Sequence, residues 1–239
     1  MTVVHFLVLI AGVTAGFYVN TIVGFSAALV SFPFFLLVMN IRDAVGLESI
    51  FYLLSSIILT FKNYKLINRK VVGELAIGIV IGLIAGIKLL KSGDPIILKK
   101  IFGVFVLIMV AYLYFHNRKN KHFKRLGILF GFAGGFFSGL FATGGPPVVA
   151  YIYNKIDENS VMRASIIGAL GVINMIKAPM LIYSGIINLP LLLLALCLMP
   201  FFILAIILGH RTYNKINEEV FRNILLLLLM ASGISIIIL

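Results

Sequence analysis

Residues 131–151 read GFAGGFFSGLFATGGPPVVAY, and this stretch decides how the chain can cross a membrane. It is apolar enough to enter a bilayer, but Thr143-Gly144-Gly145-Pro146-Pro147 cannot continue an ordinary helix, because proline lacks an N–H and glycine loosens the backbone. Non-helical backbone at membrane depth is tolerated only where it is buried in protein or lines a polar cavity. The break is therefore a candidate binding site.

The composition indicates an integral membrane protein. Hydrophobic residues make up 62% of the 239 positions and charged residues 12%, which lies far outside the range of soluble domains. Apolar runs recur without a long polar segment, so we predict a single membrane domain over residues 1–239. The net charge of +12 comes from lysines and arginines between the runs, where they act as topology signals and do not indicate nucleic-acid binding.

Two of the apolar runs differ from the others in length and content. The runs cover residues 3–39, 44–61, 71–90, 97–115, 126–152, 161–183, 188–209 and 220–239. Six of them are close to the ~20 residues that one helix needs to cross the hydrocarbon core. The runs 3–39 and 126–152 contain Gly, Ser, Thr or Asn in mid-run. Each is either a long tilted helix or a hairpin of two shorter helices, which gives eight to ten helices in total.

The chain contains an internal repeat. A shift of 119 residues (131 − 12) places Gly12 on Gly131, and small or polar residues then recur every four positions in both copies. Each half, about 1–120 and 121–239, has one long run followed by three spans. The repeat therefore gives the Gly-rich run of the second half a counterpart in the first.

The positions of the basic residues favour hairpins for both long runs. If each long run crosses once, the loop lysines and arginines divide nine against ten between the two sides. If each run returns to its own side, they divide fourteen against five, with Lys177 left in the membrane. Only the second arrangement follows the positive-inside rule. It predicts a multi-pass protein of the cell membrane with loops 62–70, 116–125, 153–163 and 210–222 in the cytoplasm.

A hairpin plus three spans crosses the membrane an odd number of times, so the second half must be inverted relative to the first. The predicted fold is an all-α polytopic membrane protein with two inverted repeats. Each repeat has a Gly-rich helical hairpin, broken or re-entrant, and three transmembrane helices. Such repeats are characteristic of secondary transporters, which bind substrate near the midplane where broken helices meet.

The second hairpin carries both packing and binding candidates. Gly131, Gly135 and Gly139 form one helical face, which is typical of tight helix packing. After the turn, Thr143 is expected to cap a half-helix that begins near Pro146. Such a helix start offers backbone N–H groups and the positive end of the dipole, which suit a small anion.

The first hairpin supplies a second set of candidates. Gly24-Phe25-Ser26 occupies the corresponding place, with Ser26 as the expected cap and Asn20 as a further polar group. We expect the two tips to converge on one site, although a purely structural bend would leave the same pattern. The predicted substrate-binding residues are Asn20, Gly24, Phe25, Ser26, Thr143, Gly144, Gly145, Pro146, Asn174 and Lys177.

Few charged residues lie inside the apolar runs. Lys177 is either the counter-charge of an anionic substrate or a side chain that snorkels toward the nearer surface, and Asn174 lies on nearly the same helical face. Glu48 is the candidate for a coupling proton, as is Glu74, although both are near span ends where a solvated position is the alternative. Lys88 ends its span and is expected to snorkel.

Enzyme and cofactor motifs are missing from the sequence. It has no Gly-x-x-x-x-Gly-Lys phosphate loop, no His-Glu-x-x-His and no Gly-x-Ser-x-Gly. The four histidines lie at ends or in loops. We therefore predict no catalytic residue, no metal site, no cofactor and no ATP-driven transport by this chain alone.

The sequence resembles the TauE/SafE family of sulfite-exporter-like membrane permeases. The clearest match is Gly135-Phe136-Phe137-Ser138-Gly139-Leu140-Phe141-Ala142-Thr143-Gly144-Gly145-Pro146-Pro147, with residues 16–33 as its counterpart. The first copy departs from the pattern, since Gly24-Phe25-Ser26 stands where a run of glycines is expected. The resemblance implies transport of small anions, commonly sulfur-containing ones such as sulfite or organosulfonates.

The resulting hypothesis is a secondary permease that works by alternating access. Its expected partners are a small anion, the lipid bilayer and a coupling proton or ion, and homo-oligomerisation is left open. The alternatives are an intramembrane enzyme, an accessory subunit of sulfur metabolism and an anion channel. An enzyme requires reactive groups clustered at one depth, whereas Lys177, Glu48 and Cys197 belong to different runs.

Overall fold

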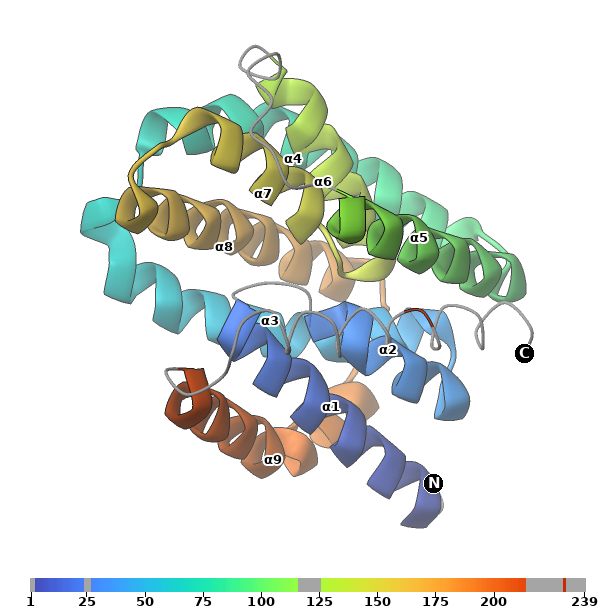
Figure 1. Ribbon diagram of the computed structural model, residues 1–239. Helices are drawn as coiled ribbons and strands as arrows, with labels where there is room; N and C mark the ends of the chain where they lie inside the picture. The colour runs from blue at the N-terminus through green and yellow to red at the C-terminus, as the bar shows by residue number, and fades with distance from the viewer. Residues whose placement is uncertain (1–2, 24–26, 116–125, 214–229, 231–239) are drawn as a thin grey trace. The chain divides into compact units, whose positions relative to one another are not determined.

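The computed structural model describes residues 3–23, 27–115, 126–213 and 230, and the regular structure in these residues is helical (Figure 1). The helices are α1 (Val3–Val23), α2 (Ala27–Val38), α3 (Ile41–Asn63), the 3-10 turn η1 (Tyr64–Leu66), α4 (Arg69–Ser92), α5 (Pro95–Phe115), α6 (Gly127–Phe141), α7 (Gly145–Lys155), α8 (Asn159–Tyr183) and α9 (Leu189–Tyr213). The predicted all-α class is confirmed.

Several of these helices can span a bilayer. In the described part of the chain, α1, α3, α4, α8 and α9 are long and apolar enough to do so, while α2 and α6 are shorter apolar helices. The protein is therefore a polytopic membrane protein. The last apolar run of the sequence, 220–239, lies outside the described residues except for Met230.

The apolar run 126–152 is broken where its sequence predicts a break. Helix α6 ends at Phe141, and Ala142 follows in the left-handed region with φ of 54°. Helix α7 then begins at Gly145 with two prolines in its first turn, a position where a missing N–H does no harm. The run therefore forms two helices and not one long tilted helix.

Helices α6 and α7 form a hairpin whose two ends lie at the same end of α4. At the start of α6, a Cβ placed on Gly127 would lie 3.0 Å from the carbonyl oxygen of Glu74 and 2.9 Å from the hydroxyl of Tyr151. At the end of α7, Lys155 Nζ donates to Glu74 Oε2 at 2.7 Å. The run thus returns to the side from which it started, as the hairpin interpretation predicts.

Glycine faces bring α6 and α4 into backbone contact. A Cβ on Gly82 of α4 would collide with the carbonyl oxygen of Phe132, and one on Gly135 of α6 would collide with that of Ile79. Further glycines on this interface behave alike: Gly78, Gly86 and Gly131. The predicted packing role of the series Gly131, Gly135 and Gly139 is confirmed, and the α4 glycines have the same role, because only a missing side chain permits this approach.

The chain divides into two compact units that both contain elements from the two halves of the sequence. The first unit comprises Met1–Ala44, Gly93–Asn117 and Leu193–Leu239, and the second comprises Val45–Ser92 and Arg118–Leu192. Each hairpin therefore packs with helices of the other half. The prediction of a single membrane domain stays a prediction.

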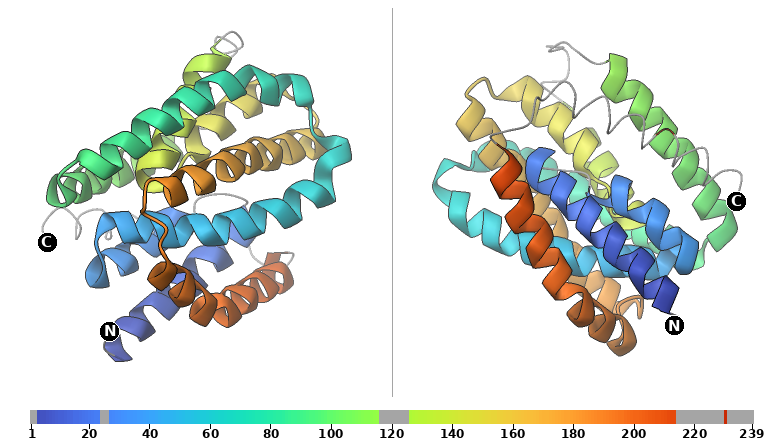
Figure 2. Two further views of the ribbon diagram at one scale, coloured as in Figure 1. Left: turned by 180° about the vertical axis from the view of Figure 1, so that it is seen from behind. Right: turned by 60° about the horizontal axis from the view of Figure 1, so that its bottom comes forward.

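In the first unit, α1 and α2 form the other hairpin. A Cβ on Gly12 would lie 2.8 Å from the ring of Phe35, and one on Gly16 would lie 2.9 Å from Cβ of Ser31, so the two helices run in opposite directions. Helix α9 packs against α1, where the rings of Phe17 and Phe202 meet edge to face at 4.8 Å (Figure 2).

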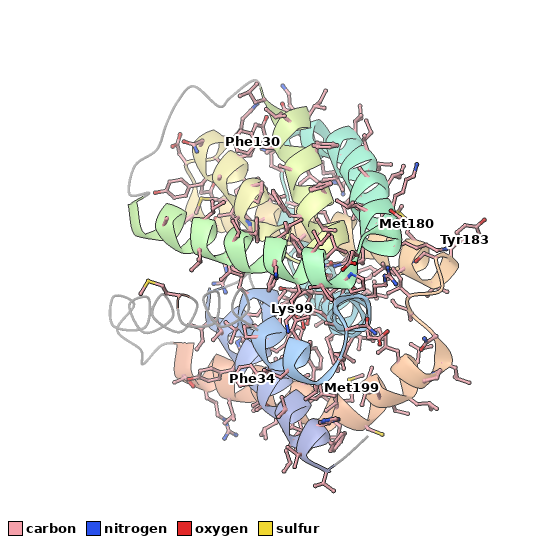
Figure 3. The ribbon with its side chains drawn as sticks, turned by 90° about the vertical axis from the view of Figure 1, so that its right-hand side faces the viewer. Phe34, Lys99, Phe130, Met180, Tyr183 and Met199 are labelled. Carbon is pink, nitrogen blue, oxygen red and sulfur yellow. The ribbon has the colours of Figure 1, made fainter. Side chains whose placement is uncertain are left out.

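In the second unit, one apolar core joins α4, α6, α7 and α8. Its buried members include Leu75, Ile79, Leu83, Val148, Tyr151, Ile152, Ala169 and Ile173. Phe130, labelled in Figure 3, covers this core from α6 with its ring 5.8 Å from that of Tyr151. The α6–α7 hairpin is thus held on two sides, by α4 and by α8.

The helix bounds repeat along the chain. Helices α2, α3 and α4 start at residues 27, 41 and 69, and α7, α8 and α9 start at 145, 159 and 189, which gives offsets of 118, 118 and 120. A first helix, a short second helix and two long helices thus occur twice in the same order. The inverted orientation of the two halves remains a prediction.

Candidate functional site

Helices α3 and α8 lie side by side in the second unit and run in opposite directions (Figures 1 and 2). A Cβ on Gly46, near the start of α3, would meet Ile186 just beyond the end of α8. Near the other end of α3, Thr60 fills the space beside Gly171 of α8. The two helices therefore contact each other over much of their length.

A line of polar residues follows this interface. Glu48, Tyr52, Ser56 and Thr60 recur every four residues, which places them on one face of α3. Asn174 and Lys177, three residues apart, face them from α8. We call these six residues the polar seam.

Lys177 is the most unusual member of the polar seam. Its side chain is 0% exposed, and its Nζ makes no hydrogen bond within the described residues. The ammonium group lies 5.4 Å from the centre of the Tyr52 ring, a distance typical of a cation–π contact. A charge at the centre of a membrane helix costs about 2.5–3.5 kcal/mol on insertion scales, so this position requires compensation.

Glu48 provides part of that compensation. Its side chain is also 0% exposed, and its charge attracts that of Lys177 across the interface. Tyr183, which is 96% exposed at the end of α8 and labelled in Figure 3, shows where a snorkelling group would emerge. The snorkelling interpretation of Lys177 and the solvated interpretation of Glu48 are therefore both wrong. Lys177 instead points into the α3–α8 contact, where its ammonium group lies over the Tyr52 ring, and Glu48 is fully buried.

Asn174 extends the polar seam by one helical turn. Its amide Nδ2 donates to Ser56 Oγ at 2.7 Å, and both side chains are buried. Hydrogen bonds between membrane helices satisfy polar groups that lipid cannot satisfy. Asn174 and Lys177 therefore share one environment, as the sequence predicts.

The tip of the α6–α7 hairpin contributes a second buried polar group. Thr143, Gly144, Gly145 and Pro146 are all buried, and Thr143 Oγ1 makes no hydrogen bond within the described residues. The backbone N–H of Thr143 donates to the carbonyl oxygen of Phe137 at 3.3 Å.

The expected capping role of Thr143 is wrong. The residue at the N-cap position of α7 is Gly144, and no side chain caps this helix. A cap bonds to the N–H of the second or third helical residue, and here those residues are Pro146 and Pro147, which have none. For the same reason this helix start offers an anion fewer backbone donors than the sequence interpretation assumed.

The hairpin and the polar seam both involve α8. Ile173 belongs to the core that also contains Val148 of α7, and the next residue, Asn174, belongs to the polar seam. Neither Thr143 Oγ1 nor Lys177 Nζ hydrogen-bonds to the other or to any described residue. The α6–α7 hairpin and the polar seam therefore involve neighbouring residues of α8, but no hydrogen bond joins Thr143 Oγ1 to Lys177 Nζ.

The candidates of the first hairpin are only partly described. Asn20 lies in α1 and is half-buried, in the first unit. Gly24, Phe25 and Ser26 lie outside the described residues. The predicted convergence of the two hairpin tips therefore stays a prediction.

Glu74 has a different role from Glu48. Its side chain is 31% exposed and accepts hydrogen bonds from Lys155 and Tyr151 of α7. This cluster fixes the end of the hairpin to α4. Lys88, farther along α4, is exposed, as the snorkelling prediction requires.

Sequence reasoning did not identify Tyr52, Ser56 and Thr60. Their spacing of four residues from Glu48 was the signal that could have indicated them, because it places all four on one helical face. No group of three or more His, Cys, Asp or Glu side chains that could hold a metal ion occurs among the residues described.

Comparisons with known proteins agree with this description. The family model described as "Sulfite exporter TauE/SafE" matches residues 8–236. A probable membrane transporter protein of Methanocaldococcus jannaschii is 30% identical over 150 residues, which cover 58% of this chain and 53% of the relative. The chain thus matches about half the length of that curated relative. No solved structure gives a significant match.

Proposed function

The chain belongs to the sulfite exporter TauE/SafE family, and from this premise we propose that it is a secondary transporter for a small anion. The family makes it a membrane transporter, which implies that it is not an enzyme. The substrate we propose is a sulfur-containing oxyanion, such as sulfite or an organosulfonate. Transport proceeds by alternating access along an existing gradient.

The observation that carries this proposal is the fully buried Lys177. A basic side chain within a membrane protein marks a substrate pathway or a counter-ion position more often than a structural one. Its ammonium group has an aromatic ring and an attracting carboxylate around it but no hydrogen-bond acceptor in the described residues. An oxyanion would supply the missing acceptors and bring the opposite charge.

The neighbouring groups suit an oxyanion as well. The amide of Asn174 and the hydroxyl of Ser56 lie next along the polar seam, and the hydroxyl of Thr143 has no partner in the described residues. Donors of this kind can surround an anion that has several oxygen atoms. Asn20, Gly144, Gly145 and Pro146 stay candidates from the hairpins.

Inverted repeats would explain the position of the Asn174–Ser56 contact. The two residues are 118 positions apart, which equals the offset between the starts of α3 and α8. Equivalent residues of two antiparallel helices touch only where a two-fold axis passes between them. This contact supports an axis in the membrane plane near Ser56 and Asn174, the arrangement that places a transporter site at the repeat interface.

For the topology we propose the cell membrane, with the loops 62–70, 116–125, 153–163 and 210–222 in the cytoplasm. The positive-inside rule supports this orientation. So does the α6–α7 hairpin, because it brings the start of α6 and the end of α7 to one end of α4.

Uptake by proteoliposomes tests the proposed function. Purified protein should take up radiolabelled sulfite, sulfoacetate or methanesulfonate in a saturable manner, and Lys177→Met should abolish this uptake. Lys88→Met is the matched control, since Lys88 is an exposed lysine in another helix of the same unit. If none of the three anions is transported, or if Lys177→Met leaves uptake unchanged, the proposal is wrong.

A further inference from the structure

We propose that the anion replaces Glu48 as the counter-charge of Lys177. Glu48 takes up a proton whenever it is replaced, so that anion and proton cross the membrane together. This inference rests on the proposed function and adds its coupling ion and stoichiometry. The neutral pair of the empty transporter becomes a neutral set of three groups in the loaded one: protonated Glu48, charged Lys177 and a monovalent anion.

The geometry of the polar seam carries the inference. Glu48 and Tyr52 are one turn apart on α3, and the Tyr52 ring lies 5.4 Å from Lys177 Nζ. Both charged side chains are 0% exposed. Glu48 therefore lies one helical turn from the residue whose ring Lys177 contacts, and its charge acts on that of Lys177, which makes it the resting counter-charge in the proposed cycle.

Displacement of a buried counter-charge forces a change of protonation. When an anion approaches Lys177, the carboxylate of Glu48 faces a like charge and loses the attraction that stabilised it. A buried carboxylate in that situation is more stable as the neutral acid. The proton joins one carboxylate oxygen of Glu48, and it leaves again when the anion is released. No covalent bond to the anion forms or breaks.

The charged groups around Lys177 leave Glu48 as the group that can carry the proton. The charge that acts on Lys177 among the described residues is that of Glu48, and the titratable Tyr52 comes from the same helix. Helix α6 has no charged residue, and the buried residues of α4 are apolar or glycine. Glu74 of α4 and Lys155 of α7 pair with each other.

That pair has its own charge balance. The carboxylate of Glu74 accepts hydrogen bonds from Lys155 and Tyr151 of α7, so Glu74 already has a positive partner within the described residues.

The test uses proteoliposomes and methanesulfonate, whose charge does not change with pH in the range used. For the wild type we expect an inwardly directed proton gradient to accelerate uptake several-fold, and a membrane potential set with potassium and valinomycin to have no effect. Glu48→Gln should lose the response to the proton gradient but retain exchange of internal for external anion. The neutral amide has nearly the same shape as the protonated carboxyl group, and it cannot release or take up a proton.

Glu74→Gln is the matched control, since it removes the other carboxylate found in an apolar run. It should keep the response to the proton gradient. If sulfite or sulfoacetate is the only anion carried, Glu48→Gln and the wild type are compared in the same pH gradient and at the same anion concentration.

A second measurement does not require transport. Addition of the carried anion to wild-type protein in weakly buffered detergent should cause uptake of a proton, reported by a pH dye, and Glu48→Gln should show binding by thermal shift without proton uptake. Absence of any anion transport overturns the proposed function together with this inference. Anion transport that ignores the proton gradient, or a Glu48→Gln variant that still follows it, overturns the inference alone.

Discussion

The amide of Asn174 donates to the hydroxyl of Ser56 at 2.7 Å, across the interface of two antiparallel helices and across 118 residues of sequence. This bond links α3 of the first half of the chain to α8 of the second. It lies beside Lys177, so it fixes the position of the helix that carries the buried charge.

We predict that the Asn174–Ser56 hydrogen bond stabilises the protein and that the contributions of the two side chains depend on each other. Asn174→Ala and Ser56→Ala should each lower the stability of the protein in detergent, and the double variant should lose less than the sum of the two. A coupling energy of about 0.6 kcal/mol, at most about 1.7, is typical of such bonds in membranes. A double-mutant cycle of unfolding free energies measures it, and strictly additive effects would contradict the pairing.

We predict that the α4–α6 contact tolerates no side chain at its glycines. Gly82→Ala should destabilise the protein by about 1–3 kcal/mol, because the new Cβ would collide with the backbone of Phe132. Gly73→Ala on the same helix is the control, since a Cβ there has no atom within 4 Å, and it should be neutral or stabilising by up to about 1 kcal/mol. Thermal unfolding of both variants measures these effects. Equal changes in stability for Gly82→Ala and Gly73→Ala would contradict close packing at Gly82.

We predict that loss of the Thr143 hydroxyl raises the stability of the protein and lowers its transport activity. Thr143→Val removes a buried hydroxyl that has no partner in the described part of the chain, so the empty protein should gain about 1 kcal/mol of stability. Uptake of the carried anion should fall at the same time, and Thr143→Ser should restore it. A loss of stability in Thr143→Val would show that the hydroxyl has a structural role instead.

We predict that the loops before α6 and after α7 are on the same side of the membrane. Single cysteines are introduced into a Cys197→Ser background, which is needed because the native cysteine is exposed. Cysteines at Lys119 and Ser160 should react with an impermeant reagent from the cytoplasmic side, and one at Gly93 from the opposite side. Labelling of Lys119 and Ser160 from different sides would contradict the hairpin topology.

Much of this architecture follows from local properties of the sequence. The Gly-Gly-Pro-Pro interruption predicts a break because neither proline can donate a backbone hydrogen bond, and the structure breaks the helix at residues 142–144. For the runs that the structure describes, the ends agree with the helix bounds to within a few residues, because about 20 apolar residues match the thickness of a bilayer. Sequence reasoning failed at Thr143 because it did not consider that the two prolines remove the donors that a cap requires.

The polar seam depends on contacts that local pattern cannot reveal. The sequence by itself determined that the chain spans a membrane, that its long runs break, and that Lys177 and Glu48 need an explanation, since each of these follows from hydropathy, proline chemistry or the cost of a charge in lipid. Only the tertiary structure decided that these two charges are both buried and act on each other. Helices α3 and α8 are far apart in sequence, and their antiparallel packing sets which turns face each other. That packing buries Lys177 beside Tyr52, whereas Glu74 forms a salt bridge with Lys155.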